Sequence, residues 1–79
     1  MILSPNPVSD ILTITANGEE GQIKRFDVYN VSGQKMKTYN ISKSERFIET
    51  DLSILNEGLY YVKVELISGE IVNRKVIKL

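Results

Sequence analysis

The sequence contains no cysteine and no histidine. Without cysteine, no disulfide can cross-link the fold, and cysteine usage says nothing about the redox compartment. Without histidine, the chain lacks the usual proton shuttle and the commonest nitrogen ligand of metals. Its serines have no histidine to activate them, and no Gly-x-Ser-x-Gly elbow is present. We therefore expect no enzymatic activity, no catalytic residue, no metal site and no cofactor.

The sequence also lacks an excess of charge and a long apolar run. Its 10 basic and 10 acidic residues give a formal net charge of +0. This balance argues against a protein that binds nucleic acid or an anionic membrane through bulk charge. No segment approaches the roughly 20 apolar residues of a membrane helix, so we expect no direct membrane insertion.

The N-terminus carries no recognisable export signal, because the apolar start is followed at once by Ser4-Pro5-Asn6-Pro7. Prolines fix φ, lack a backbone donor and favour extended geometry in the residue before them. Residues 1–9 are therefore predicted to be a Pro-rich lead-in or the end of a linker. We expect residues 1–79 to form a single domain cut from the end of something longer.

The clearest strand follows the turn Asn56-Glu57-Gly58, in which glycine can adopt positive φ. Residues 59–67 alternate with a period of two, which predicts a strand with one buried face. The expected core face consists of Tyr60, Val62, Val64 and Leu66. Before the turn, Leu52 and Leu55 are spaced to plug one end of the core.

Other segments show the same alternation with interruptions. Residues 10–16 predict a strand whose core face contains Leu12 and Ile14. In residues 23–31 the alternation breaks, and a bulge near Lys24-Arg25 would restore it.

The middle of the chain predicts a polar edge strand. Residues 34–39 follow a hairpin turn at Gly33, and we expect Met36 to face the core. Residues 41–45 are predicted to be a polar connection. Phe47 and Ile48 are adjacent in the next strand, so one of the two must lie outside the main core. Turn signals recur about every 8 to 12 residues, which predicts a β-sandwich.

The last residues, 73–79, combine basic and apolar side chains up to the terminus. The apolar positions predict that this strand is docked rather than a disposable tail. Its basic residues either prevent aggregation through the strand edge or belong to an accessible edge to which a receptor adds a β-strand.

Two further groups of residues are candidates for binding a sugar or a calcium ion. Tyr29, Tyr39 and Tyr61 would form a platform for sugar rings if they shared one face, although filling partly buried sheet surface is the simpler explanation. The loop carboxylates match no calcium-binding loop, which favours solvated charge. A structural spacer is the remaining alternative.

The motifs of this chain resemble those of the type IX secretion C-terminal sorting domain, also called the Por secretion tail, of certain Gram-negative bacteria. The resemblance spans residues 3–79 and depends on motifs that occur in order. These motifs are Pro5-Asn6-Pro7 with the Ile11-Leu12-Thr13-Ile14 strand, the strand and glycine turn of residues 26–34, the segment 51–64, and Lys75-Val76-Ile77-Lys78. Ser4 departs from the pattern, in which an aromatic residue often precedes the first proline.

The resemblance implies an all-β, immunoglobulin-like antiparallel β-sandwich of about six to seven short strands. It also implies a non-catalytic address that targets an upstream cargo domain of the same polypeptide to the type IX outer-membrane translocon. A sortase-like peptidase would then cut before about residue 3 and join the cargo to surface lipopolysaccharide. The implied location is secreted or cell-surface, reached through the periplasm and outer membrane of a Gram-negative bacterium.

We expect the terminal strand to carry the readout, while glycines and a tyrosine maintain the fold. The expected sorting and recognition residues are Pro5, Asn6, Pro7, Gly33, Gly58, Tyr60, Arg74, Lys75, Val76, Ile77, Lys78 and Leu79. The expected partners are the translocon, the peptidase and the cargo, without nucleic acid. An open edge strand would also permit a weak homodimer.

Overall fold

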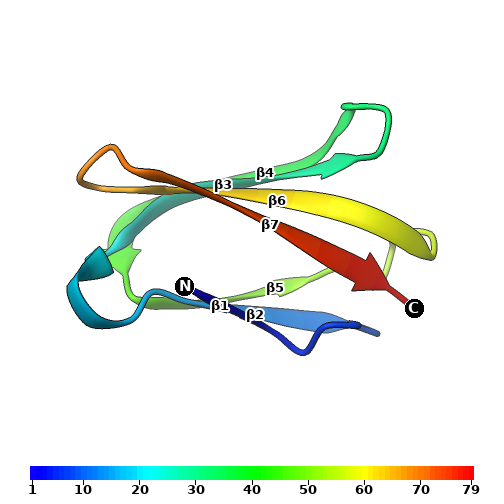
Figure 1. The fold of residues 1–79 in the computed structure, drawn as a ribbon, viewed down its shortest axis with the longest axis horizontal. Coiled ribbons are helices and arrows are strands. Elements are labelled where there is room, and N and C mark those ends of the chain that lie inside the picture. The colour runs from blue at the N-terminus through cyan, green and yellow to red at the C-terminus, as the bar shows by residue number, and fades with distance from the viewer.

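The structure is a computed structural model that describes residues 1–79 except the side chain of Ser44. Two antiparallel sheets stack as two layers (Figure 1). Over the described residues the strands are β1 (Ile2–Ser4), β2 (Ile11–Thr15), β3 (Ile23–Asn30), β4 (Lys35–Glu45), β5 (Phe47–Asp51), β6 (Gly58–Leu66) and β7 (Ile71–Lys78). A short 3₁₀ turn, η1 (Gly18–Glu20), follows β2. The predicted all-β, immunoglobulin-like sandwich is confirmed.

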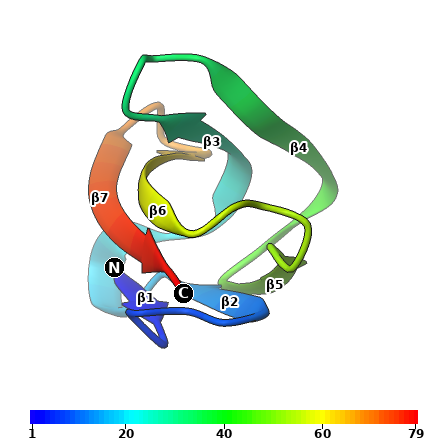
Figure 2. The ribbon, with the colours of Figure 1, turned by 90° about the vertical axis from the view of Figure 1, so that its right-hand side faces the viewer.

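The smaller sheet has the strand order β1-β2-β5, and the larger has the order β4-β3-β6-β7. Every neighbouring pair within the two sheets is antiparallel. The edges of the sheets are therefore β1, β5, β4 and β7. Figure 2, an end view, shows β7 on the same side of the sandwich as β1, with β4 above β5 on the other side.

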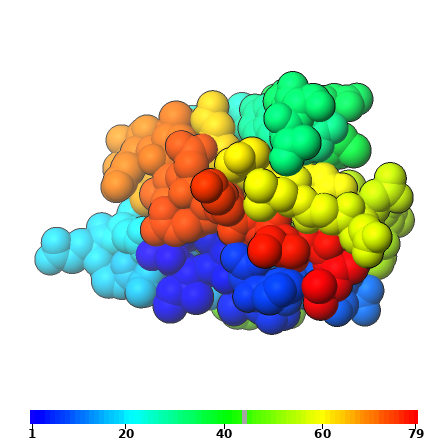
Figure 3. Space-filling model, turned by 45° about the vertical axis from the view of Figure 1, so that its right-hand side comes forward, coloured from blue at the N-terminus to red at the C-terminus, as the bar shows by residue number. Residues whose placement is uncertain are grey.

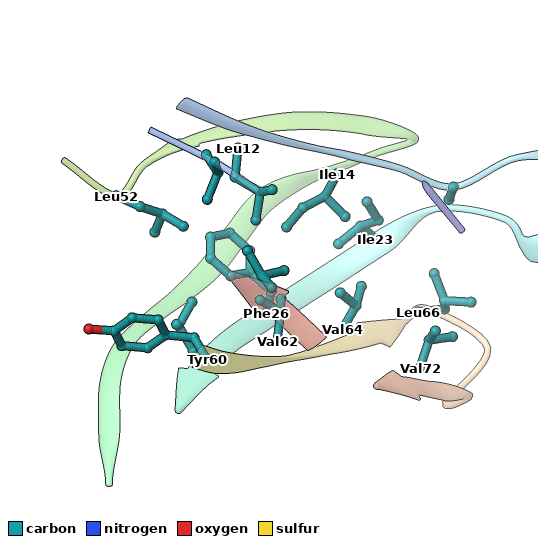
Figure 4. Packing of buried hydrophobic residues seen from close by; sticks show 14 residues of the cluster. Leu12, Ile14, Ile23, Phe26, Leu52, Tyr60, Val62, Val64, Leu66 and Val72 are labelled. Carbon is teal, nitrogen blue, oxygen red and sulfur yellow. The ribbon is translucent and has the colours of Figure 1, made fainter. Parts of the chain in front are cut away.

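The core lies between the two layers and is built by alternation along the strands. Leu12 and Ile14 point into it from β2 and are fully buried. The predicted core face of β6 is confirmed over its whole length, because Tyr60, Val62, Val64 and Leu66 are all buried. The ring of Phe26 lies among them in the centre (Figure 4). Burying one such side chain contributes roughly 1.5–3 kcal/mol.

The turn before β6 closes one end of the core. Leu52 is buried there, and its backbone N–H donates to Asp10 O over 2.8 Å. Gly58 then begins β6 with φ +147°, a conformation that disfavours any residue with a Cβ. The expected plug is confirmed for Leu52, and Leu55 packs against the core while half-buried.

The predicted bulge in β3 is confirmed, since the register shifts between Ile23 and Arg25. A second shift between Val28 and Tyr29 was not predicted. It leaves Met36 as the extra residue on β4, 41% exposed, and sets Lys37 opposite Val28. The expectation that Met36 faces the core is therefore wrong, because one extra residue reverses the alternation that follows it.

The structure corrects the predictions for residues 41–45 and for the N-terminal segment, and it confirms the prediction for the pair Phe47 and Ile48. Residues 41–45 are not a connection, since β4 continues to Glu45 and pairs there with Ile23. The lead-in contains a strand of its own, β1, in which Leu3 pairs with Ile14. As predicted, one of Phe47 and Ile48 lies outside the main core: Phe47 is exposed, whereas Ile48 packs against the core.

The Pro-rich segment carries the chain from one sheet to the other and back. After β1 in the smaller sheet, Val8 forms a parallel bridge with Lys78 of β7 in the larger sheet. The chain then returns to the smaller sheet as β2. In Figure 3 the last residues, in red, lie against the blue N-terminal residues. The segment that follows β1 and the end of β7 are thus neighbours.

Candidate functional site: the junction of the first and last segments

Residues 6–8 and 75–79 form one hydrogen-bonded unit, which we call the terminal junction. Asn6 Nδ2 donates to Lys75 O over 2.9 Å, and Asn6 Oδ1 accepts from the backbone N–H of Ile77 over 2.9 Å. The backbone adds Val8 N–H to Ile77 O at 2.8 Å and Leu79 N–H to Val8 O at 2.9 Å. The sequence-predicted residues at the two ends of the chain are therefore brought together.

The sequence Pro-Asn-Pro explains why a side chain takes part in this pairing. Pro5 and Pro7 have no N–H and cannot donate to a neighbouring strand. The side-chain amide of Asn6 carries both a donor and an acceptor, like a peptide group. It therefore supplies to β7 the pair of hydrogen bonds that the backbone of this segment cannot supply.

Burial reinforces the junction. Val8 and Val76 are fully buried, so each anchors its segment in the core. Lys78 is buried as well, and its Nζ donates to Leu79 O over 2.7 Å. Because β7 pairs with β6 from Ile71 to Lys78, the last strand is docked along its length, as the apolar residues predict.

The maintenance residues named from the sequence lie at different distances from the junction. Gly58 pairs with Lys78, and Tyr60 pairs with Val76, so both flank the junction across the β6–β7 ladder. The hydroxyl of Tyr60 donates to Asn56 O over 2.8 Å. Gly33 sits in the turn between β3 and β4, the two strands furthest from β7 in the sheet order, with φ +82°. It shapes a turn and does not contribute to the junction.

The charges near β7 are mostly basic. Arg74, Lys75 and Lys78 belong to this strand. Close to Arg74 lies the carboxylate of Glu20, whose pKa is lowered chiefly by a hydrogen bond from the Met1 ammonium group, then by the backbone of Asn17, with the charge of Arg74 contributing less.

The tyrosines do not form a common platform. Tyr29 and Tyr61 pair across β3 and β6 on the outer face of the larger sheet. Tyr39 lies on the opposite face, where its ring stacks on Phe26 with centroids 5.7 Å apart and planes at 11°. Of the three tyrosines proposed to bind sugar rings, only Tyr29 and Tyr61 share a face.

An open groove of about 370 Å³ lies between β4 and β5, and no motif in the sequence pointed to it. Its apolar lining includes Phe26, Tyr39 and Ile48, and its rim carries Lys43 and Glu49. Ile41 and Glu45 of β4 and Phe47 of β5 also line the groove.

No group of three or more acidic residues is placed to hold a metal ion in the part of the chain that the structure describes. Among the same residues, no helix has the length and apolar character needed to cross a membrane.

Comparison with known protein families shows a match to a sorting domain. The family model described as "Secretion system C-terminal sorting domain" matches residues 3–78 of the chain. The match therefore includes both sides of the terminal junction up to Lys78. None of the curated proteins compared matches the chain.

Proposed function

We propose, from the premise that this chain belongs to the family of secretion system C-terminal sorting domains, that it directs an attached cargo to the type IX translocon of the outer membrane. The domain acts as a folded address and not as a catalyst. Its cargo precedes it in the same polypeptide, and the destination is the outside of the cell or its surface.

The observation that carries this proposal is the terminal junction. The family match begins at residue 3 and ends at residue 78, and Asn6 bonds to Lys75 and Ile77 across 69 and 71 positions of sequence. A chain that lacks residues 75–79 lacks the partners of Asn6 and Val8. The address is therefore complete only when the last strand is present, which suits a signal that certifies a finished cargo.

The sorting machinery would read a shape and a strand, for which no catalytic group is needed. We place the readout on the terminal strand, residues 74–79, with Pro5, Asn6 and Pro7 holding it. After export, a sortase-like peptidase would cut on the N-terminal side of β1 and join the cargo to surface lipopolysaccharide. Since β1 begins at Ile2 and pairs with β2, a cut upstream of Ile2 would keep this pairing.

The test is a reporter fused to the N-terminus of residues 1–79 and expressed in a bacterium that has the type IX machinery. We expect the reporter at the cell surface, and we expect deletion of residues 75–79 to abolish its export. Ile54→Ala serves as the matched control because Ile54 is an exposed turn residue. A wild-type fusion that stays inside the cell, or a deletion that is exported equally well, would refute the proposal.

One observation favours a second candidate, an accessory carbohydrate-binding or adhesion module. Tyr29 and Tyr61 are cross-strand neighbours on an outer sheet face, and Lys35 Nζ lies 5.8 Å from the centroid of the Tyr29 ring. Sugars stack on such aromatic surfaces. Titration of the isolated domain with a panel of bacterial glycans tests this, with Tyr61→Ala as the variant expected to lose binding.

A further inference from the structure

The outer edge of β7 is covered along only part of its length. In an antiparallel strand, successive residues direct their backbone N–H and C=O groups to opposite sides. The contacts of Lys75, Ile77 and Leu79 with residues 6–8 show that the odd-numbered residues of β7 face outward. The cover extends no further towards Ile71, because the chain before Asn6 turns away at Pro5 into β1 of the other sheet.

Residues 71–75 therefore present an open edge. Among the described residues, the backbone N–H groups of Ile71, Asn73 and Lys75 have no hydrogen-bond partner. The carbonyl oxygen of Asn73 accepts only from its neighbour Arg74, whose Nη1 lies 3.0 Å away. The exposed Arg74 side chain can move aside at little cost. Unpaired groups of this kind are a template for an added strand.

The other three edges are less suited to accept a strand. The β4 edge is broken by register shifts in its pairing with β3. The β5 edge is obstructed where Lys37 Nζ donates to Asp51 O over 3.0 Å. The β1 edge has only the three residues Ile2–Ser4. Of the four, the β7 edge offers the most regular run of open backbone groups.

Charge indicates what kind of strand would pair there. Lys63 is the cross-strand neighbour of Asn73, and Lys75 follows two residues later on the same outer face. Arg74 projects from the opposite face of β7. Two carboxylates also lie near this edge: Glu65, the cross-strand neighbour of Ile71, is 3.7 Å from Lys24 Nζ, and Glu20, close to Arg74, binds the Met1 ammonium group. With both carboxylates paired, the charges of Lys63, Arg74 and Lys75 favour acidic side chains on a partner strand opposite residues 73–75 and disfavour basic ones.

We propose that residues 71–75 of β7 accept an edge strand, bearing acidic side chains, from a protein of the sorting machinery. This inference rests on the proposed function and moves its readout from residues 74–79 to the part of β7 nearer Ile71. Within the terminal strand 74–79, where the sequence placed the contact, residues 75–79 are already bonded to residues 6–8. The receptor strand adds beyond them, on the part of β7 that the terminal junction leaves open.

The test removes one outward donor without touching the β6–β7 ladder. Asn73→Pro deletes the N–H that faces the partner, and proline is tolerated where a strand N–H faces solvent. Asn73→Ala is the matched control, because it changes the same side chain and keeps the N–H. In the surface-reporter assay we expect Asn73→Pro to lower export by about tenfold or more and Asn73→Ala to export like wild type. Thermal unfolding of the purified domains checks that both variants fold.

A second variant keeps the test decisive if Asn73→Pro does not fold. Lys63→Glu combined with Lys75→Glu reverses the charge of two surface side chains beside the open edge, and we expect it to lower export while the domain stays folded. Lys43→Glu, at the distant β4 edge, is its control. Normal export of the folded double variant overturns the inference.

Three further outcomes are equally informative. If wild type and folded Asn73→Pro are both exported normally, the edge inference alone is overturned. If wild type is not exported, the proposed function itself is overturned. Loss of export in Asn73→Ala assigns the contact to the side chain and overturns strand addition. Sedimentation that shows a dimer of wild-type domain, lost in Asn73→Pro, assigns the edge to a second copy and also overturns it.

Discussion

Asn6 Oδ1 accepts a hydrogen bond from the backbone N–H of Ile77 over 2.9 Å, although 71 positions of sequence separate the two residues. The same amide donates to Lys75 O. One side chain thus makes both bonds that a backbone peptide group would make to the edge of β7. This relationship ties the Pro-rich segment, which could not pair through its own backbone, to the last strand.

Replacing Asn6 should loosen this tie. Each exposed hydrogen bond contributes roughly 0.5–1.5 kcal/mol, so we expect Asn6→Ala to lower the free energy of unfolding by about 1–2 kcal/mol. Urea denaturation measures the loss, and the Ile77 amide should exchange with solvent faster. Asn40→Ala, at an exposed position on β4, should change stability by less than about 0.5 kcal/mol. Equal effects of the two variants would contradict the role given to Asn6.

The turn before β6 allows a comparison of two apolar residues. Leu52 is 1% exposed and Ile54 is 91% exposed. We expect Leu52→Ala to cost about 2–5 kcal/mol, because it removes buried apolar area and leaves a cavity. Ile54→Ala should change stability by less than about 0.5 kcal/mol. Thermal unfolding decides, and a Leu52→Ala domain as stable as wild type would show that this residue does not plug the core.

The hydroxyl of Tyr60 should contribute separately from its ring. It donates to Asn56 O over 2.8 Å in a partly buried setting. Tyr60→Phe keeps the apolar ring and removes the bond, so we expect a loss of roughly 0.5–1.5 kcal/mol. Tyr61→Phe is the control, since Tyr61 is 37% exposed on the outer face. Chemical denaturation measures the free energy of unfolding of both variants. Equal values would show that the hydrogen bond from Tyr60 to Asn56 O does not stabilise the fold.

Acid should destabilise the fold through Asp27, which is 4% exposed. Burial raises the pKa of this carboxyl, but hydrogen bonds from Thr38 and Arg25 and the charges of Arg25 and Lys35 outweigh it, so its pKa lies below the usual 3.8. A carboxyl whose pKa is lowered by folding stabilises the protein above its unfolded-state pKa, and this contribution disappears as the pH falls through the folded-state value.

We therefore expect the free energy of unfolding to fall as the pH drops below about 3.8, the ordinary value for this group. Asp27→Asn should remove this part of the acid dependence, and Thr38→Val should weaken it. Denaturant titrations from neutral pH downwards follow the effect. An Asp27→Asn domain with the acid slope of wild type would contradict it.

Local pattern predicted much of the fold. The alternation of Tyr60, Val62 and Val64 identified the core face of β6, because a period of two leaves little freedom once one face is buried. The broken alternation around Lys24-Arg25 marked a real bulge. Glycine at Gly58 marked the turn because φ +147° suits no other residue as well.

The wrong predictions have a common physical cause. The register between two strands depends on both strands together and cannot be predicted from the sequence of either one alone. Met36 was misplaced because the second bulge depends on how β3 and β4 align. The uncovered half of the β7 edge was also unpredictable, since it depends on where Pro5 turns the chain away. For the candidate site, sequence named the residues of both ends but not their contact.

The crossing of residues 6–8 onto β7 also has a mechanical consequence. A cargo attached as proposed would pull on this domain at residue 1, and a partner strand on β7 would hold it at residues 71–75. Tension between the two would load the pairing of β1 with β2 and then the hydrogen bonds of Asn6 and Val8 to the last strand. The central pairing of β3 with β6 lies outside this path, so under load the N-terminal segment would separate before the middle of the larger sheet.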